Sequence, residues 1–182
     1  MTDHEAADST MQVLLTQEQI QKRVAEMGAE ILRDYSSDEE IHLICVLKGG
    51  FVFLSDLVRA LKSRVTLDFI ALSSYGKGTR SSGEVRLLKD VDHALENRHV
   101  IVVEDIVDTG LTLHYLQEIL RARSPKTLRT ACLLNKPSRR EVEVPVEYIG
   151  FTIEDRFVVG YGLDYEERYR ELPYIAVLAN GE

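Results

Sequence analysis

Three carboxylates lie close together in the middle of this chain, directly after a short apolar run. The run from Val100 to Val103 is followed by Glu104 and Asp105, and Asp108 comes three residues later. A buried strand that carries acids at its carboxyl end, followed by a turn of small residues into a helix, is how open α/β sheets build sites for phosphates and sugars. The segment therefore predicts a site for a phosphorylated sugar.

The residues after Asp108 have the composition of a phosphate-binding helix start. Residues 109–112 are expected to begin a helix, and the first backbone N–H groups of a helix have no partner within it. Such groups, together with the threonine hydroxyls, suit phosphate oxygens. Threonine is also a common helix cap, so the segment alone is equally consistent with an ordinary helix start. The two acids just upstream favour the phosphate site.

Each of the three acids has two possible roles. Glu104 and Asp105 repel each other at neighbouring positions, and a cation or sugar hydroxyls would relieve that repulsion; otherwise they form an exposed strand end. Asp108 is either the N-cap of the following helix or a general base directed at a bound substrate.

Apolar spacing along the rest of the chain predicts the elements that hold these residues. Helical spacing predicts helices over 16–35, where Thr16 and Gln19 form a capping box, and in the segments that follow Gly50 and Thr112. A Gly- and Ser-rich loop is expected at 73–84. Apolar runs predict strands at 41–47, 65–72, 85–89, 100–104, 128–134, 148–153 and 175–178.

This alternation of strands and helices predicts an α/β fold with a parallel sheet covered by helices on both faces. In such sheets ligands bind beyond the carboxyl ends of the strands. Three predicted strands end in unusual polar sequence, namely Lys48-Gly49-Gly50, Glu104-Asp105 and Asn135-Lys136. We expect these three ends to line one crevice.

Composition limits the class of protein. The 182 residues, 45% of them hydrophobic, fit a single domain over 1–182, with residues 1–11 as a disordered leader. The net charge of −8 argues against a nucleic-acid-binding face. Cys45 and Cys132 lie in apolar runs and are expected to be buried, reduced thiols. No signal peptide or membrane-spanning run is recognisable, so a cytoplasmic protein is expected.

Several motifs, in this order along the chain, resemble one known family. Residues 102–113 are similar to the phosphoribosyl-pyrophosphate motif of the type I phosphoribosyltransferases. The wider set resembles the bacterial hypoxanthine-guanine phosphoribosyltransferases through residues 47–50, Ser74-Tyr75-Gly76, Lys136-Pro137 and residues 157–165. The resemblance covers roughly residues 12–180, and no motif position departs from the family pattern.

The resemblance implies a fold and a reaction. The fold is a central parallel sheet with helices on both faces and a small hood formed by residues of about 12–40 and 150–182. The reaction is purine salvage, in which the 5-phosphoribosyl group moves from 5-phospho-α-D-ribose 1-diphosphate to N9 of hypoxanthine or guanine. Mg²⁺ is the implied cofactor, and IMP or GMP and pyrophosphate are the products. The family forms dimers and tetramers, so a homo-oligomer, with a homotetramer favoured, is expected.

The resemblance also implies roles for single residues. Asp108 would be the catalytic residue and accept the proton from purine N7. The ribose and 5′-phosphate would be bound by Glu104, Asp105, Asp108, Thr109, Gly110, Leu111 and Thr112. The pyrophosphate would be bound by Lys48, Gly49, Ser74, Tyr75 and Arg170, after a Leu47–Lys48 peptide that is often cis in this family. The purine would be bound by Lys136, Phe157, Val158 and Asp164, and Mg²⁺ by Glu104, Asp105 and Asp164.

Two rival functions stay open. Lys136 as a hydrogen-bond donor disfavours adenine, whose 6-amino group cannot accept a hydrogen bond, but a transferase that prefers xanthine fits the same residues. The second rival is a regulator with this fold that binds nucleic acid, which would need a basic face. Taken alone, Lys136 reads as a surface lysine and Phe157 as a core aromatic, so the roles of both depend on the resemblance.

Overall fold

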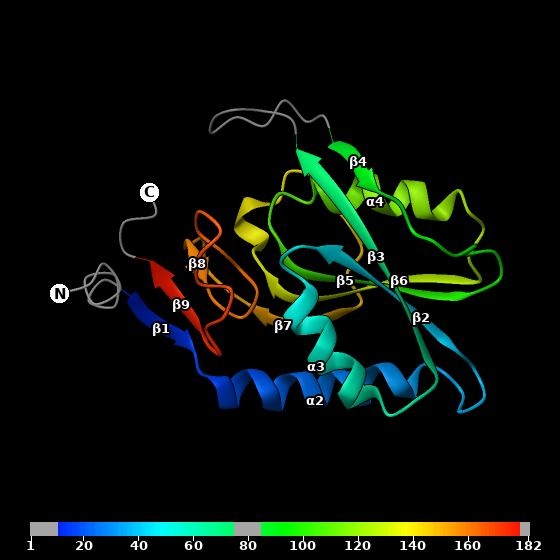
Figure 1. Ribbon diagram of the computed structural model, residues 1–182, viewed down its shortest axis with the longest axis horizontal. Coiled ribbons are helices and arrows are strands. Elements are labelled where there is room, and N and C mark those ends of the chain that lie inside the picture. The colour runs from blue at the N-terminus through cyan, green and yellow to red at the C-terminus, as the bar shows by residue number, and fades with distance from the viewer. Residues whose placement is uncertain (1–10, 75–84, 179–182) are drawn as a thin grey trace.

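The chain folds into two sheets of unequal size (Figure 1). The computed structural model describes residues 11–74 and 85–178, in which the larger sheet has six strands in the order β4-β3-β2-β5-β6-β7. These are β2 (Ile41–Leu47), β3 (Val65–Ser74), β4 (Val85–Lys89), β5 (His99–Val107), β6 (Thr127–Asn135) and β7 (Tyr148–Thr152). Neighbouring strands run parallel except β4, which is antiparallel to β3, so the predicted parallel sheet is confirmed.

Helices cover both faces of the larger sheet. Helices α2 (Gln17–Arg33) and α3 (Phe51–Leu61) pack on one face, and α4 (Leu111–Arg121) packs on the other (Figure 1). Alternate residues of β5 point to opposite sides, because Val103 joins the cluster with α2 and α3 whereas Val102 joins the cluster with α4. Burial on both sides explains why β2 and β5 read as nearly continuous apolar runs. Within the described residues, no helix is long and apolar enough to cross a membrane.

Helix α2 begins as the sequence predicts. The Thr16 hydroxyl accepts a hydrogen bond from the Gln19 backbone N–H at 3.3 Å, and the Gln19 side chain accepts one from the Thr16 N–H at 2.8 Å. This reciprocal pair is the predicted capping box. The helix ends at Arg33, earlier than the predicted residue 35. Gly28 lets it approach α3 closely, because a Cβ there would lie 3.0 Å from the Cβ of Ala60.

A smaller, three-stranded sheet joins the two ends of the described chain (Figure 1). Strand β1 (Met11–Leu15) pairs with β9 (Ile175–Leu178), which also pairs with β8 (Val158–Val159), and both pairings are antiparallel. The apolar patterns do not predict β1 or β8, because both are short. Met11 therefore belongs to a strand and not to the predicted leader, whereas residues 1–10 lie outside the described part of the chain.

Helix α2 packs mainly against α3 and β7 of the larger sheet, in a core cluster that also contains residues of the small sheet. Its buried residues Ile20, Val24 and Met27 form a stripe along one side of the helix, which contacts α3 and β7. Of the segment from 12 to 40 that the resemblance assigns to a hood, only β1 lies in the small sheet. Most of this stripe is buried against apolar residues of α3 and the larger sheet.

Two strands extend at least two residues past their predicted carboxyl ends. Strand β5 runs to Val107, past its predicted end at Glu104, because β6 continues beside it and Glu104 pairs with Cys132. Glu104 and Asp105 therefore lie inside the strand and not at its tip. Strand β3 runs to Ser74, into the predicted loop, where it pairs with β4. The rest of that loop, including Tyr75, lies outside the described residues.

Candidate active site

The carboxyl ends of β2, β5 and β6 lie side by side, and residues of β2 and β5 line one cavity. A cavity of about 160 Å³ lies where β5 passes into α4. It is lined by Val46, Glu104, Ile106, Val107, Asp108, Thr109, Gly110, Thr112 and Leu113. After β2, Gly49 lies against Asp105. After β6, the Lys136 backbone N–H donates a hydrogen bond to the Val107 carbonyl at 3.0 Å. We call this cavity the phosphosugar pocket.

The turn between β5 and α4 is braced by backbone contacts from outside the pocket. Gly110 has a φ of +87°, in the left-handed region that favours glycine, and a Cβ there would lie 2.6 Å from the Val142 carbonyl oxygen. The Thr109 carbonyl accepts hydrogen bonds from the N–H groups of Glu141 at 2.9 Å and Val142 at 3.2 Å. The first turn of α4, through Thr112, thus faces the pocket with N–H groups that have no partner within the helix.

Asp108 does not cap α4. Gly110 holds the N-cap position, and the side chain that accepts a hydrogen bond from the Leu111 N–H, at 3.4 Å, is the Thr109 hydroxyl. The Oδ1 atom of Asp108 instead lies 3.1 Å from Arg139 Nε, and Arg139 Nη1 lies 3.5 Å from Asp155 Oδ2. The helix-cap alternative is therefore wrong, and Asp108 is a pocket carboxylate paired with an arginine.

The two adjacent acids of β5 are costly to ionise. Glu104 is only 6% exposed, and burial, with a smaller contribution from Asp105, raises its pKa well above the ordinary value. Burial also raises the pKa of Asp105 to about 6, although this carboxylate accepts a hydrogen bond from the Ile106 N–H at 2.8 Å. A divalent cation would offset this cost because it supplies the opposite charge. The pair therefore fits the magnesium site that the resemblance implies.

Gly49 lies between Asp105 and the C-terminal part of the chain. The Leu47–Lys48 peptide that precedes it is cis, as the resemblance implies. A Cβ at Gly49 would overlap the Asp105 carboxylate, and a Cβ at Gly162, where φ is +99°, would overlap the Gly49 carbonyl. Only glycine fits these positions, and the contact joins the acids of β5 to the segment that follows β8.

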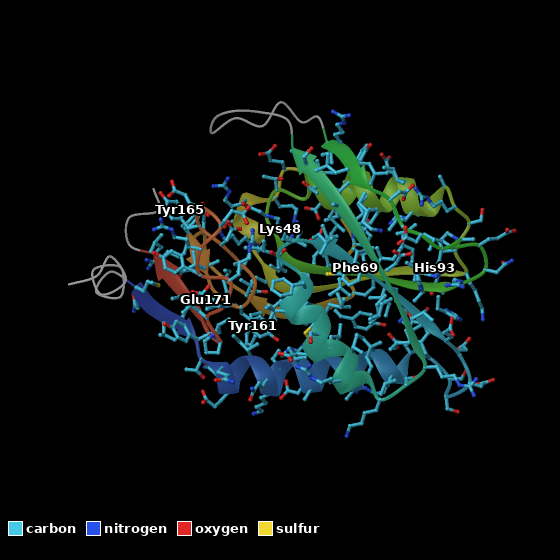
Figure 2. All side chains as sticks on the ribbon, in the orientation of Figure 1. Lys48, Phe69, His93, Tyr161, Tyr165 and Glu171 are labelled. Carbon is cyan, nitrogen blue, oxygen red and sulfur yellow. The ribbon has the colours of Figure 1, made fainter. Side chains whose placement is uncertain are left out.

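Lys48 belongs to a cluster of four charged side chains. Its Nζ lies 2.9 Å from Glu167 Oε2, and the Arg170 Nη2 atom lies 2.7 Å from Asp164 Oδ1 (Lys48 is labelled in Figure 2). Arg170 also donates to a backbone carbonyl at 2.8 Å, while its buried Nε has no partner among the described residues. The hydrogen bond from Lys48 is the main reason that the pKa of Glu167 is lowered. The structure thus brings together the predicted residues Lys48, Asp164 and Arg170.

Lys136 and Phe157 have exposures that favour functional roles. Lys136 is only 7% exposed, and its Nζ lies 3.8 Å from Asp155 Oδ1. Phe157 is 39% exposed, and Tyr165 packs edge-on against it with the ring centroids 5.6 Å apart. Lys136 is therefore not an ordinary surface lysine, and Phe157 is not an ordinary core residue, which were the alternatives to their functional roles. Val158, by contrast, is buried in β8, so only its backbone could face a ligand.

Arg139 and Glu167 are members of the site that sequence patterns do not identify. Arg139 ends a short 3-10 turn (Pro137–Arg139). Its position just after the Lys136-Pro137 motif was the only feature of the sequence that could have pointed to a role in the site. Glu167 contacts Lys48 across 119 residues of sequence, and it has a φ of +63°, which is uncommon for a residue with a side chain. Neither pairing follows from local sequence, because each joins segments that meet only in the folded chain.

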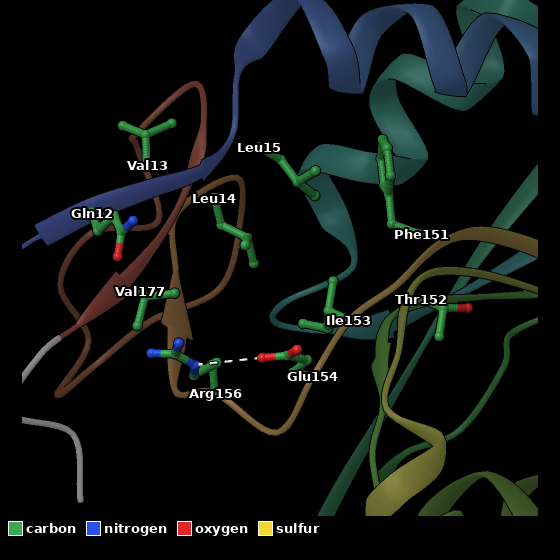
Figure 3. A pocket seen from close by; sticks show the side chains of 10 residues that line it. All are labelled: Gln12, Val13, Leu14, Leu15, Phe151, Thr152, Ile153, Glu154, Arg156 and Val177. Carbon is green, nitrogen blue, oxygen red and sulfur yellow. Dashed lines mark ion pairs between the residues drawn. The ribbon is translucent and has the colours of Figure 1, made fainter.

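A larger cavity of about 350 Å³ lies on the small sheet and shares no lining residue with the phosphosugar pocket (Figure 3). Side chains of β1, including Leu14 and Leu15, face Ile153 and Val177 across it. Its charged lining residues are Glu154 and Arg156, which pair with each other at 3.9 Å. The cavity thus lacks the buried acid (Glu104), which is unpaired among the described residues, and the helix start that make the smaller one chemically suited to a phosphosugar.

Comparison with known proteins places this chain among phosphoribosyl transferases. The model of the phosphoribosyl transferase domain matches residues 12–166. The chain is 48% identical to the hypoxanthine-guanine phosphoribosyltransferase of Bacillus subtilis, with 91% of this chain and 92% of that protein covered. It is 47% identical to the hypoxanthine phosphoribosyltransferase of Escherichia coli, with 91% and 94% covered.

Solved structures agree with these sequence matches. A hypoxanthine-guanine phosphoribosyltransferase from Bacillus anthracis superposes with a TM-score of 0.87 at 51% identity, covering 91% of this chain and 97% of that one. A hypoxanthine phosphoribosyltransferase from Staphylococcus aureus superposes with a TM-score of 0.91 at 41% identity, covering 97% and 96%. The architecture of both sheets is therefore shared with these enzymes.

Asp105→Asn is expected to stabilise the ligand-free protein at neutral pH. The carboxyl group holds its proton more tightly in the folded chain, with a pKa of about 6 against an ordinary value of 3.8. Stability is therefore lost as the pH rises through that interval, and asparagine removes the loss. Urea denaturation should show about 1–3 kcal/mol of added stability at neutral pH and little difference near pH ~3.5.

Asp90→Asn is the matched control, and its expected effect on the free energy of unfolding has the opposite sign. A hydrogen bond from Arg123 lowers the pKa of Asp90, so this carboxylate contributes stability above its ordinary pKa. The control variant should be less stable than the parent at neutral pH. An Asp105→Asn protein that also loses stability there would contradict the view that burial makes Asp105 costly to ionise.

Proposed function

Because this chain belongs to the phosphoribosyl transferase family and, within it, to the hypoxanthine phosphoribosyltransferases, we propose that it works in purine salvage. It transfers the 5-phosphoribosyl group from 5-phospho-α-D-ribose 1-diphosphate to N9 of hypoxanthine or guanine, and it releases IMP or GMP with pyrophosphate. The observation that carries the proposal is the phosphosugar pocket, in which Glu104, Asp108 and a helix start meet at the carboxyl end of the sheet.

The pocket suits the phosphoribosyl half of the donor. The 5′-phosphate accepts hydrogen bonds from the first turn of α4, where residues 109–112 supply backbone N–H groups and two threonine hydroxyls. The carboxylates of Glu104 and Asp105 accept hydrogen bonds from the ribose 2′ and 3′ hydroxyls. Hydroxyl donors of this kind suit the two acids because they stabilise the ionised form in a buried site.

Glu104, Asp105 and Asp164 are the residues that we propose to hold Mg²⁺. Carboxylate oxygens are the ligands that this cation uses in proteins, and the raised pKa values of the first two acids support their part in the site. When bound, Mg²⁺ neutralises charge on the departing pyrophosphate. Asp164 is paired with Arg170. Binding of Mg²⁺ would therefore require the Asp164 carboxylate to contact both the arginine and the cation, or to leave the arginine.

Pyrophosphate is proposed to bind around the turn after β2. The Lys48 ammonium, the Gly49 backbone and the Arg170 guanidinium supply donors, and a guanidinium matches the geometry of phosphate oxygens. The donor's anionic groups would replace Glu167 as the partner of Lys48. Ser74 and Tyr75 are proposed as further pyrophosphate ligands on the family resemblance alone. Ser74 is the last residue of β3, and Tyr75 lies outside the described residues.

Asp108 is proposed to act as the general base that accepts the proton from purine N7. Its Oδ1 lies 3.1 Å from Arg139 Nε, which leaves the second carboxylate oxygen for the substrate. Loss of the N7 proton makes N9 the better nucleophile toward C1 of the ribose. The sugar carries positive charge in the transition state, because the bond to pyrophosphate breaks while the new bond to N9 is still long.

Lys136, Phe157, Val158 and Asp164 are proposed to select the base. The Lys136 ammonium donates to the 6-oxo group, while the Phe157 ring stacks on the purine and the Val158 backbone contacts its edge. The low exposure of Lys136 strengthens such a hydrogen bond, because water competes less for the ammonium. Adenine is disfavoured, whereas a preference for xanthine depends on contacts at the 2-position and is the alternative that we keep.

We further propose a cytoplasmic enzyme that assembles as a dimer or tetramer. Cys45 and Cys132 are both free and buried, which suits a reducing compartment. The oligomeric state rests on the family resemblance, and light scattering of the purified protein tests it. The acidic charge opposes the rival function of a nucleic-acid-binding regulator.

The substrate proposal is tested by turnover with four bases. The protein is mixed with Mg²⁺, the pyrophosphate donor and either hypoxanthine, guanine, xanthine or adenine, and nucleotide formation is followed by absorbance. We expect turnover with hypoxanthine and guanine and none above background with adenine, because Lys136 can only donate. Faster turnover with xanthine than with either expected base would favour the alternative, and no turnover with both expected bases would reject the proposal.

Asp108→Asn tests the general base. We expect kcat to fall by about 10²- to 10⁴-fold, the usual contribution of such a group, with little change in the KM for the pyrophosphate donor. Asp38→Asn, in an exposed turn after α2, is the control and should leave kcat unchanged. An Asp108→Asn enzyme with the parental kcat would show that Asp108 serves only to pair with Arg139.

A further inference from the structure

Three side chains with metal-binding atoms meet at the end of the sheet opposite the phosphosugar pocket. His42 lies near the start of β2, Asp68 lies in β3, and His93 follows β4. One nitrogen of each histidine and one carboxylate oxygen of Asp68 lie within 4.8 Å of one another. We propose that these three residues bind a divalent transition metal of the zinc class.

His42 has a buried ring nitrogen without a hydrogen-bond partner among the described residues. Its side chain is 1% exposed, and its Nε2 atom is buried with no hydrogen-bond partner among the described residues. Its other ring nitrogen, Nδ1, lies 2.9 Å from the Thr66 hydroxyl. If Nδ1 carries the proton and donates it to that hydroxyl, the lone pair of Nε2 points toward Asp68, whose Oδ2 lies 3.9 Å away. An outer hydrogen bond of this kind orients the histidines that bind metals in proteins.

Asp68 and His93 complete a three-ligand set. The His93 Nδ1 atom lies 3.0 Å from Asp68 Oδ2, which also accepts hydrogen bonds from the backbone N–H groups of Asp92 at 2.8 Å and His93 at 3.1 Å. These amides hold the carboxylate in place. Zinc bonds of about 2.0–2.1 Å in a tetrahedron put neighbouring ligand atoms roughly 3.3 Å apart. The distances from Asp68 Oδ2 to His93 Nδ1 and His42 Nε2 are 3.0 and 3.9 Å, and all three ligand atoms lie within 4.8 Å of one another. The His93 side chain is 56% exposed, so it can adjust and the fourth position is open to water.

Charge and ligand type determine which metal suits the site. Two imidazole nitrogens favour zinc, cobalt, nickel or copper over magnesium, which prefers oxygen ligands. Lys89 Nζ lies 3.8 Å from Asp68 Oδ1, and Arg98 Nη1 lies 3.4 Å from His42 Nδ1. These cations oppose a bound metal, so the affinity should be lower than that of a closed site with four protein ligands.

The site is independent of the proposed catalytic cation. His42 precedes Lys48 by six residues of nearly extended chain, which corresponds to about 20 Å at the usual rise of a strand. Figure 2 shows His93 near one end of the molecule, far from Tyr165 at the other. A metal here would join β2, β3 and the segment after β4, and would therefore act on stability and not on the chemical step.

Cobalt titration of the full chain tests the proposal. Co²⁺ is added in the presence of excess Mg²⁺, which occupies the carboxylates of the phosphosugar pocket, and the visible absorption of tetrahedral cobalt is followed. We expect one equivalent to bind, Zn²⁺ to displace it, and Zn²⁺ to raise the melting temperature by several degrees. His93→Ala should weaken binding by at least tenfold, whereas the control His114→Ala, also an exposed histidine, should not.

A second measurement avoids dependence on any variant. In imidazole NMR spectra of the unaltered protein, Zn²⁺ should shift the resonances of His42 and His93 and leave those of His114 in place. Absence of a tetrahedral cobalt spectrum, binding that His93→Ala does not weaken, or shifts confined to other histidines would each overturn the proposal.

Discussion

The site is organised around the ionisation of two adjacent acids inside a buried strand. Glu104 and Asp105 lie within β5 because β6 continues beside them, and burial raises the pKa of both carboxyls. Ionising these buried carboxyls lowers the stability of the folded chain, because burial disfavours the charged form. Under the proposed function, a cation and sugar hydroxyls offset this cost, because both stabilise the ionised carboxylates.

Backbone contacts at three glycines assemble the site from distant segments. Gly49 approaches the Asp105 carboxylate, Gly162 covers the Gly49 carbonyl, and Gly110 fits beneath the Val142 carbonyl. Each contact removes the space that a side chain would need. The parallel sheet supplies strands whose ends lie side by side, and the glycines let the loops after those strands approach one another closely.

The cations of the site are already paired with acids in the ligand-free chain. Lys48 lies beside Glu167, Arg170 beside Asp164, and Arg139 beside Asp108. These pairs orient the charged groups, and under the proposed function the anionic donor has to compete with the acids for the cations. Because most of the paired groups are partly exposed, each pair contributes little to stability and can be exchanged at small cost.

Local sequence determined the parts of this protein that depend on local chemistry. The capping box of α2, the bounds of β2, the parallel sheet and the acid-rich turn into α4 were all predictable, because burial on both faces, helix capping and a turn of small residues leave short-range patterns. Tertiary structure alone decided that Glu104 and Asp105 lie inside a strand, that Asp108 pairs with Arg139 and does not cap a helix, and that His42 meets His93. Those features depend on how far neighbouring strands extend and on which remote segments meet, and no short stretch of sequence contains that information.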